Sequence, residues 1–487
     1  MGAPACDFDR IFHPRRLAIV GVSPEGGIGF ANGILVACRS MGFTGEILPV
    51  NPKGGSFAGQ EIFRSLDDIS GDIDFAVIAI PAAAVPEALE ACRRKGAAGA
   101  EVVTAGFAET GTAEGRALEE QVKEAASRGI RVIGPNCFGV YCPRSGLTLL
   151  PGPDLSRESG PVAFLSQSGG MSIDLAHLGK WMGLRFSKVV SFGNGADLRE
   201  AELLRYLAGD PETGVIAMYV EGVADGADFF DAIREAARRK PVVVHKGGLS
   251  EAGGRAVVGH TASMGGSRAI WTGVLRQVNA TQVHDLEELA QACLAFSCLP
   301  PRAFRGISCI GGGGALGAAA GDAAEAHGIM VPAFPDSLRQ RIEALLPRPG
   351  SSAPNPIDVA NPFVPPQALG RVLRLAAEDD RVDLQVLISL LYHYKSQARA
   401  LGVPVASVTP FAELADTVAA AAADTGKPVV MVLPDLKRGG DDLDMAEVMT
   451  LAREAFRERG VPVFGRIGEA LRALGHVNAY YGRRHGR

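Results

Sequence analysis

Short apolar runs alternate with longer, alanine-rich helical segments through the first third of the chain. The runs are rich in β-branched residues and predict strands at 17–20, 46–50, 75–80, 101–104 and 131–133. Strands separated by helical segments in this way are typical of a parallel, doubly wound sheet. We therefore expect an α/β domain at the N-terminal end of this sequence.

The same alternation continues to the last residues. Further strands are predicted at 162–165, 189–192, 215–220, 241–244, 306–310, 384–388 and 428–433, and helices at 171–178, 315–326 and 467–474. Two proline-containing segments, 151–160 and 299–301, have the composition of domain boundaries. The pattern therefore predicts an α/β protein of three domains, residues 1–150, 151–298 and 299–487.

Loops that follow the first five strands contain glycine, proline and small polar residues. In an open parallel sheet such loops line one ligand crevice beyond the carboxyl ends of the strands. The segment 21–29 lacks the regular G-x-G-x-x-G, and no acidic residue is well placed for a ribose hydroxyl, which argues against a nicotinamide cofactor. Lys53 is a candidate for a phosphate contact, and the alternative is an ordinary exposed loop lysine.

Two strand–turn–helix segments have small residues at the turn. Ser168, Gly169 and Gly170 follow one predicted strand, and Gly311 to Gly314 follow another. Free amides at a helix start, together with the helix dipole, attract anions. The chain is expected to bring both helix starts to one phosphate, although glycine clusters alone are weak evidence.

His260 lies between small residues in a glycine-rich segment, and Glu221 ends a predicted strand. A carboxylate that accepts the Nδ1 proton of an imidazole fixes its tautomer and leaves the other nitrogen free to attack a phosphoryl group. The alternatives are a surface-loop histidine and an exposed acid at a strand end, and the sequence leaves both open.

Composition narrows the function class. The chain has 487 residues, 47% of them hydrophobic, and a net charge of −5, so no excess of positive charge indicates nucleic-acid binding. Residues 1–15 lack a secretory signal, and no apolar stretch reaches the roughly 20 residues that cross a bilayer, so we expect a cytoplasmic protein that does not bind membranes. The eight cysteines include no C-x-x-C pair, which argues against a zinc site and a disulfide framework. We expect most of them to be buried, and we assign no metal ligand.

Eight short motifs, in this order, resemble those of the NDP-forming acyl-CoA synthetase family, which includes ADP-forming acetate–CoA ligases and, more distantly, succinyl-CoA synthetases. They are Val20-Gly21-Val22-Ser23, Pro49-Val50-Asn51-Pro52-Lys53, Thr104-Ala105-Gly106-Phe107-Ala108-Glu109, Gly134-Pro135-Asn136-Cys137, Ser166-Gln167-Ser168-Gly169, Gly193-Asn194-Gly195-Ala196-Asp197, Tyr219-Val220-Glu221-Gly222 and Gly259-His260-Thr261. In the third domain Gly312-Gly313-Gly314 and Asn355-Pro356-Ile357-Asp358 add to the resemblance.

The resemblance implies a Rossmann-like CoA-binding domain followed by two flavodoxin-like domains of the succinyl-CoA-ligase type. It implies the reversible conversion of acyl-CoA, phosphate and ADP into a carboxylic acid, CoA and ATP, through an acyl phosphate and a phosphohistidine. His260 matches the phosphohistidine and Glu221 the acid that orients it. The residues implied in phosphate binding are Ser168, Gly169, Gly170, Gly313 and Gly314, and those implied in CoA binding are Gly21, Ser23, Lys53, Ile80, Pro81, Asn136 and Cys137.

Three features depart from the family pattern. Ala262 replaces a glycine after the histidine, and Gly195 stands in a motif that is commonly Asn-Lys-Ala. Nothing in the sequence resembles an ATP-grasp nucleotide-binding domain. We therefore expect an α subunit that works in a hetero-oligomer with an ATP-grasp β subunit, on which ADP or ATP and Mg²⁺ bind. The alternative hypothesis is a non-catalytic regulatory relative that binds CoA or acyl-CoA.

Overall fold

The computed structural model describes residues 6–24, 27, 29–148, 154–255 and 267–485. The chain forms two compact units, one made of Met1–Lys180 and Leu184–Leu289 and the other of Trp181–Gly183 and Ala290–Arg487. The described part of the chain contains parallel sheets flanked by helices, so the predicted α/β class is confirmed.

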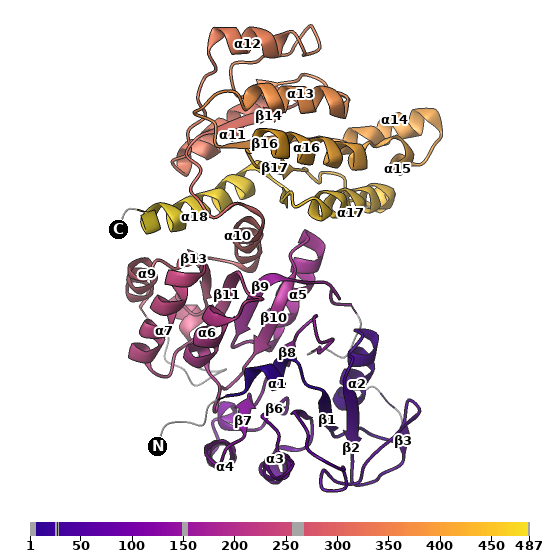
Figure 1. Cartoon of the computed structure of the whole chain (residues 1–487), viewed down its shortest axis with the longest axis vertical. Coiled ribbons are helices and arrows are strands. Elements are labelled where there is room, and N and C mark those ends of the chain that lie inside the picture. Colours follow the sequence, from indigo (N-terminus) through magenta and orange to yellow (C-terminus); the bar gives the residue numbers. More distant parts are fainter. Residues whose placement is uncertain (1–5, 25–26, 28, 149–153, 256–266, 486–487) are drawn as a thin grey trace. The chain divides into compact units, whose positions relative to one another are not determined.

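The first sheet consists of five parallel strands in the order β2-β1-β5-β6-β7 (Figure 1). Its strands are β1 (Arg16–Val20), β2 (Glu46–Val50), β5 (Phe75–Ile78), β6 (Gly99–Val102) and β7 (Arg131–Ile133). All five predicted strands are present, with ends that shift by at most two residues. A small antiparallel hairpin, β3 (Ser56–Phe57) and β4 (Gln60–Glu61), lies between β2 and β5 in the sequence.

Helices cover both faces of this sheet because alternate strand residues point to opposite sides. Helices α1 (Phe8–Phe12) and α2 (Phe30–Ser40) share one hydrophobic core with the side chains of Leu17 and Ile19. Helices α3 (Val85–Arg94) and α4 (Ala113–Ser127) share the opposite core with Ala18 and Val20. This double covering explains why the strands are apolar at nearly every position.

The second sheet has the order β13-β12-β11-β9-β10-β8. Its strands are β8 (Gly139–Tyr141), β9 (Ser159–Ser166), β10 (Phe186–Ser191), β11 (Val215–Val220), β12 (Val242–Lys246) and β13 (Thr281–Val283), and its helices are α5 (Gly169–Met182), α6 (Glu200–Gly209), α7 (Gly226–Arg239), α9 (Arg268–Gln277) and α10 (Leu286–Cys298). Strand β8 pairs antiparallel with β10 and was not predicted from the sequence. Residues before 150 thus contribute a strand to the second sheet.

Buried ion pairs tie the two sheets into one unit. Arg131 of β7 is 3% exposed, and its guanidinium contacts the carboxylates of Asp197 and Glu202 at 2.9 and 2.6 Å. Buried charges are tolerated only when they are paired in this way.

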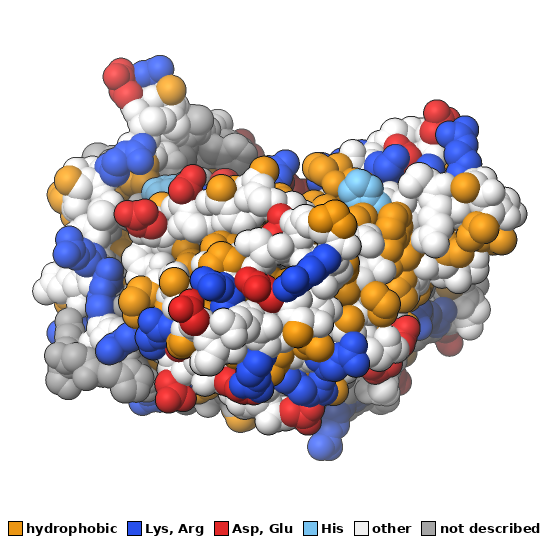
Figure 2. All heavy atoms as spheres, turned by 90° about the horizontal axis from the view of Figure 1, so that it is seen from above, with side chains coloured by type: hydrophobic (Ala, Val, Ile, Leu, Met, Phe, Trp, Pro, Cys, Tyr) orange, Lys and Arg blue, Asp and Glu red, His pale blue; other side chains and the backbone are white. Residues whose placement is uncertain are grey.

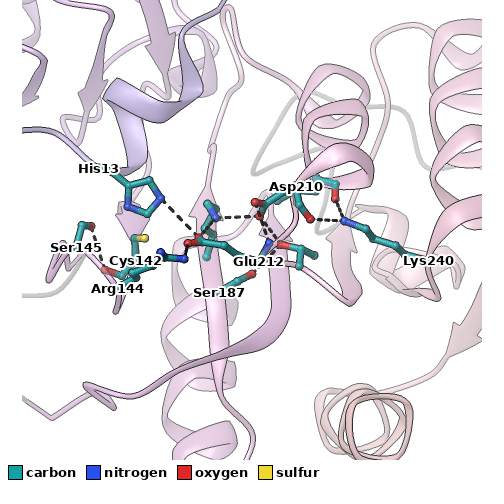
Figure 3. A network of polar contacts seen from close by, with 11 residues as sticks. His13, Cys142, Arg144, Ser145, Ser187, Asp210, Glu212 and Lys240 are labelled. Atoms are coloured by element: carbon teal, nitrogen blue, oxygen red, sulfur yellow. Dashed lines mark hydrogen bonds and ion pairs between the residues drawn. The ribbon is translucent and has the colours of Figure 1, made fainter. Parts of the chain in front are cut away.

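A second network surrounds the ammonium of Lys188 (Figure 3), which is 1% exposed. Its Nζ lies 2.9 Å from Asp210 Oδ2 and 2.5 Å from Glu212 Oε2. Glu212 also faces Nε2 of His13, at 3.5 Å, and the guanidinium of Arg144. Residues from the N-terminal segment and from the second sheet therefore meet around one carboxylate.

The second unit is built on the parallel sheet β15-β14-β16-β17-β18. Its strands are β14 (Ile307–Gly311), β15 (Ile357–Asp358), β16 (Leu384–Ile388), β17 (Val429–Val432) and β18 (Val463–Phe464), and its helices are α11 (Gly314–Ala326), α12 (Asp336–Glu343), α13 (Pro366–Ala376), α14 (Tyr394–Leu401), α15 (Val405–Val408), α16 (Phe411–Thr425), α17 (Leu443–Glu458) and α18 (Ile467–His485). Helices α13, α16 and α17 lie in front of β14, β16 and β17 in Figure 1 and share their core.

Basic and acidic side chains are interspersed over the face drawn in Figure 2. Arg374 of α13 and Asp424 of α16 form such a pair at 2.7 Å, and Arg341 of α12 pairs at 2.7 Å with Glu378 in the turn after α13. Exposed pairs of this kind contribute little to stability. Among the described residues no helix is long and apolar enough to span a bilayer.

Candidate functional site

A cavity of about 800 Å³ opens in the first unit where several strands end. Its walls come from the carboxyl ends of the first sheet, from the start of α5 and from the start of α2. The lining residues are Phe30, Ala79, Ile80, Pro81, Val103, Thr104, Ala105, Asn136, Cys137, Phe138, Gln167, Ser168, Gly169, Gly170, Gly193 and Asn194. Its volume is in the range of ligand pockets, and its place matches the ligand crevice of open parallel sheets.

Seven residues that the sequence singled out line this cavity: Ile80, Pro81, Asn136, Cys137, Ser168, Gly169 and Gly170. Gly21, Ser23, Lys53 and Glu221 are not among the lining residues. Gly313 and Gly314 belong to the second unit. His260 lies outside the described residues, so its role stays a prediction.

The small residues at the start of α5 are explained by their surroundings. Ser168 Oγ accepts a hydrogen bond from the amide of Met171 at 3.3 Å, in the manner of a helix cap. A Cβ on Gly169 would lie 2.1 Å from Cδ2 of Phe138, so only glycine fits beneath that ring. A Cβ on Gly170 would meet only Ser168 Oγ, at 3.9 Å. The first amides of a helix have no partner within the helix and can receive an anion here.

Gln167 connects the ends of β9 and β11. Its Oε1 accepts hydrogen bonds from the amides of Glu221 and Gly222, the latter at 3.0 Å. Glu221 is 7% exposed, and its Oε1 accepts a hydrogen bond from the hydroxyl of Tyr219 at 3.2 Å. Its Oε2 is buried and has no hydrogen-bond partner among the described residues. A buried acceptor without a partner is costly, so Oε2 is poised to receive a donor.

Lys246 is hydrogen-bonded to the backbone of Glu221, directly after β11. Its Nζ donates to the carbonyl oxygen of Glu221 at 2.8 Å and lies 5.2 Å from the ring centroid of Trp271. Burial lowers the pKa of Lys246, while the nearby charge of Glu221 raises it. The lysine therefore fixes the position of the backbone at Glu221.

An amide network forms another wall of the cavity. Asn194 Nδ2 donates to Oε2 of Glu109 at 2.6 Å and to Oε2 of Glu119 at 2.8 Å, and its Oδ1 accepts from Asn136 Nδ2 at 3.3 Å. Burial raises the pKa of Glu109, but hydrogen bonds from Asn194 and from the amide of Gly106 outweigh it, so that its pKa lies below the ordinary value. An ionised Glu109 thus fixes the orientation of Asn194.

Cys137 contributes to the wall as a thiol. Its Sγ lies 3.4 Å from the carbonyl oxygen of Val102, and burial raises its pKa well above the ordinary value. A protonated, buried thiol is a poor nucleophile. All eight cysteines are free and six are buried, which confirms the expectation that most are buried.

Gly21 and Ser23 follow β1, and Lys53 follows β2. Gly21 has φ +111°, and a Cβ there would lie 2.4 Å from the carbonyl oxygen of Ala79. The backbone amide of Ser23 donates to Asn32 Oδ1 at 2.8 Å, and Asn32 Nδ2 donates to the carbonyl oxygen of Ser23 at 2.9 Å. The side chain of Lys53 is exposed in the neighbouring loop. Their predicted contacts with CoA stay predictions.

The second glycine-rich helix start differs from the first. The amide of Gly313 donates to Oδ1 of Asp358 at 2.8 Å, and a Cβ on Gly314 would lie 3.6 Å from Oδ2 of the same carboxylate. The amide of the residue that precedes α11 is therefore already hydrogen-bonded to a side chain of the chain itself. The described residues contain no group of three or more His, Cys, Asp or Glu that could hold a metal ion.

Several lining residues had not been assigned as site residues from the sequence. Thr104 and Gln167 lie inside motifs that carried the resemblance, and Phe138 directly follows one, so position next to a strand end could have identified them. Phe30 opens α2 and had no such signal. Its place in the wall depends on tertiary packing alone.

Comparison with known proteins agrees with this geometry. The sequence model of a CoA binding domain matches residues 15–143, and that of a succinyl-CoA ligase like flavodoxin domain matches residues 159–296. The chain is 32% identical over 475 residues to subunit alpha of the ADP-forming acetate–CoA ligase I of Pyrococcus furiosus, and the match covers 96% of each chain.

Two further similarities extend over nearly the whole chain. The ADP-forming acetate–CoA ligase I of Archaeoglobus fulgidus is 34% identical over 477 residues, which are 97% of this chain but 63% of that longer protein. The structure of the dinucleotide-forming acetyl-coenzyme A synthetase 1 of Candidatus Korarchaeum cryptofilum, in complex with phosphate and ADP, has a TM-score of 0.82 and 30% identity, with 98% of each chain covered. On this evidence, the chain belongs to the NDP-forming acyl-CoA synthetase family.

Proposed function

We propose that the chain is the α subunit of an ADP-forming acyl-CoA synthetase, which interconverts acyl-CoA, phosphate and ADP with a carboxylic acid, CoA and ATP. One observation carries the proposal: the cavity brings the CoA-binding loops of the first sheet to the open start of α5. A thioester held by those loops would place its carbonyl next to an anion-binding helix start.

The reaction divides into three balanced transfers. A phosphate oxygen attacks the thioester carbonyl, the C–S bond breaks, and CoA leaves as a thiolate that takes up a proton. His260 then attacks the phosphorus of the acyl phosphate, the P–O bond breaks, and the carboxylate leaves. The phosphoryl group finally passes from His260 to ADP. Positioning and electrostatic stabilisation supply most of the catalysis in such transfers.

We propose a role for each candidate site residue, supported by its place in the cavity or by its hydrogen bonds. Ser168, Gly169 and Gly170 bind the phosphate, and Ile80, Pro81, Asn136 and Cys137 line the path of CoA. Glu221, through its unpartnered Oε2, accepts the Nδ1 proton of His260 and so fixes the attacking nitrogen. Gly313 and Gly314 stay a prediction from the resemblance, since the amide of Gly313 already donates to Asp358. Gly21, Ser23 and Lys53 are proposed to contact more distant parts of CoA.

We further propose that an ATP-grasp β subunit supplies the site for ADP or ATP with Mg²⁺. Two relatives that match nearly end to end are named as alpha subunits of ADP-forming acetate–CoA ligases of Pyrococcus furiosus, which supports a separate partner. We place the domain boundaries of this chain near residues 150 and 298, between the CoA-binding part and the two ligase-type parts.

The test is intact-mass detection of an acid-labile phosphoryl group after incubation with an acyl-CoA and phosphate. We expect one increment in the wild type and in His284→Ala, whose exposed imidazole serves as a matched control, and none in His260→Ala. If CoA binds but His260 is labelled neither from acyl-CoA and phosphate nor from ATP with a β subunit, the non-catalytic CoA-binding alternative holds instead.

A further inference from the structure

An aromatic pair forms one wall of the cavity. The rings of Phe30 and Phe138 stack with centroids 5.7 Å apart and an interplanar angle of 29°. Phe30 is 43% exposed although it is a large apolar side chain. Both residues line the cavity. Aromatic side chains in such positions contribute strongly to ligand binding.

The pair borders the anion-binding end of the cavity. The ring of Phe138 covers Gly169, where a Cβ would lie 2.1 Å from its Cδ2. The thioester carbonyl has to reach a phosphate at this helix start. A group attached to that carbonyl would then lie in the part of the cavity that Phe138 borders.

The remaining wall offers little to a charged substrate. None of the 16 described lining residues has a charged side chain. Thr104 Oγ1 already donates to the carbonyl oxygen of Ile80 at 2.6 Å, and the amide of Asn194 donates to Glu109 and Glu119. A second carboxylate on the substrate would lose its hydration without gaining a cationic partner, which is costly.

We propose that the acyl substrate is a monocarboxylic acid with an apolar, ring-bearing tail, and that Phe30 and Phe138 select it by contact with that ring. This inference rests on the proposed function. It excludes dicarboxylic acids such as succinate as good substrates. It also predicts that acetate, which is too small to reach across the rings, is used less well than an aryl acid.

The test compares acetyl-CoA, phenylacetyl-CoA and succinyl-CoA as acyl donors, with inorganic phosphate as the source of the phosphoryl group. The measured quantity is kcat/KM for CoA release by the chain with its nucleotide-binding partner, together with the rate of His260 phosphorylation. The wild type should prefer phenylacetyl-CoA over acetyl-CoA by about tenfold or more, in the range known for apolar pockets. Phe30→Ala and the milder Phe138→Leu should lower that preference, measured as the ratio of the two kcat/KM values, by about tenfold.

Phe230→Ala is the matched control. Phe230 is a half-buried phenylalanine on α7 that is not among the cavity-lining residues, and its loss should leave the preference unchanged. Preference for acetyl-CoA or ready use of succinyl-CoA by the wild type would overturn the inference. An equal loss for all three substrates in Phe30→Ala, with a raised KM for CoA, would also overturn it, because the rings would then bind CoA itself. Failure of every acyl-CoA to phosphorylate the wild type would instead overturn the proposed function, and this inference with it.

Discussion

The two glycine-rich helix starts of this chain look alike in sequence but differ in what faces them. At α5, Ser168 to Gly170 open onto a cavity of about 800 Å³ whose described walls carry no charged side chain. At α11, the carboxylate of Asp358 accepts a hydrogen bond from the amide of Gly313. We propose that the first helix start accepts a ligand anion, whereas the amide of Gly313 at the second already donates to an internal carboxylate. A glycine-rich turn before a helix can therefore face either a ligand anion or a carboxylate of the chain itself. At α11 that carboxylate belongs to Asp358, at the end of the neighbouring strand β15.

Alanine at the two glycines gives the sharpest contrast. Gly169→Ala would push Cβ into the ring of Phe138, and we expect a loss of stability of about 1–3 kcal/mol. Displacement of the helix start should also slow His260 phosphorylation by about 100-fold. Gly314→Ala, with 3.6 Å to its nearest neighbour, should change neither by much. Urea unfolding measures the loss of stability, and the rate of His260 phosphorylation measures the second effect. Equal losses in Gly169→Ala and Gly314→Ala would show that the two helix starts do not differ in this way.

Removal of the side chains at the two helix starts is expected to have a smaller effect. Asp358→Ala leaves the amides of Gly313 and Ala360 without their acceptor and should cost about 1–2 kcal/mol. Ser168→Ala removes a cap and should cost about 1 kcal/mol. We expect only Ser168→Ala to raise the phosphate concentration needed for half-maximal labelling of His260. A similar rise in Asp358→Ala would show that α11 also binds the phosphate.

The smallest effect concerns acid sensitivity. The pKa of Glu109 is lowered in the folded chain, so its contribution to stability is present above its ordinary value of about 4.3 and is lost as the pH falls through its folded value. Thermal unfolding between pH 6 and pH 3 should show a flatter decline for Glu109→Gln than for the wild type. Glu378→Gln removes an exposed partner of Arg341 in the second unit and should leave the profile nearly unchanged. If the pH dependence of thermal unfolding is the same for Glu109→Gln and the wild type, the ionised Glu109 does not stabilise the Asn194 network in the cavity wall.

Local pattern was sufficient for most of the fold. The period of apolar residues located all five strands of the first sheet, and small residues after β9 located the start of α5. Strand β8, at the edge of the second sheet, was missed. The two-residue strands β15 and β18 are too short to show an alternating pattern.

The site was only partly readable because much of it consists of contacts between distant residues. Asn194 meets Glu109 across 85 positions, and Asp358 meets Gly313 across 45. No local pattern encodes either pair. Phe30 is an ordinary first residue of a helix until folding places its ring against Phe138. The sequence thus predicted seven of the residues that line the cavity, but not the contacts between distant residues that shape its walls.

Amide hydrogen exchange at the two helix starts tests the central claim most directly. The measurement compares the His260→Ala variant, which cannot turn over, with and without saturating CoA and phosphate. The account predicts slower exchange at the amides of residues 168–171 and unchanged exchange at residues 312–315. Slower exchange at residues 312–315 with no change at residues 168–171 would contradict it.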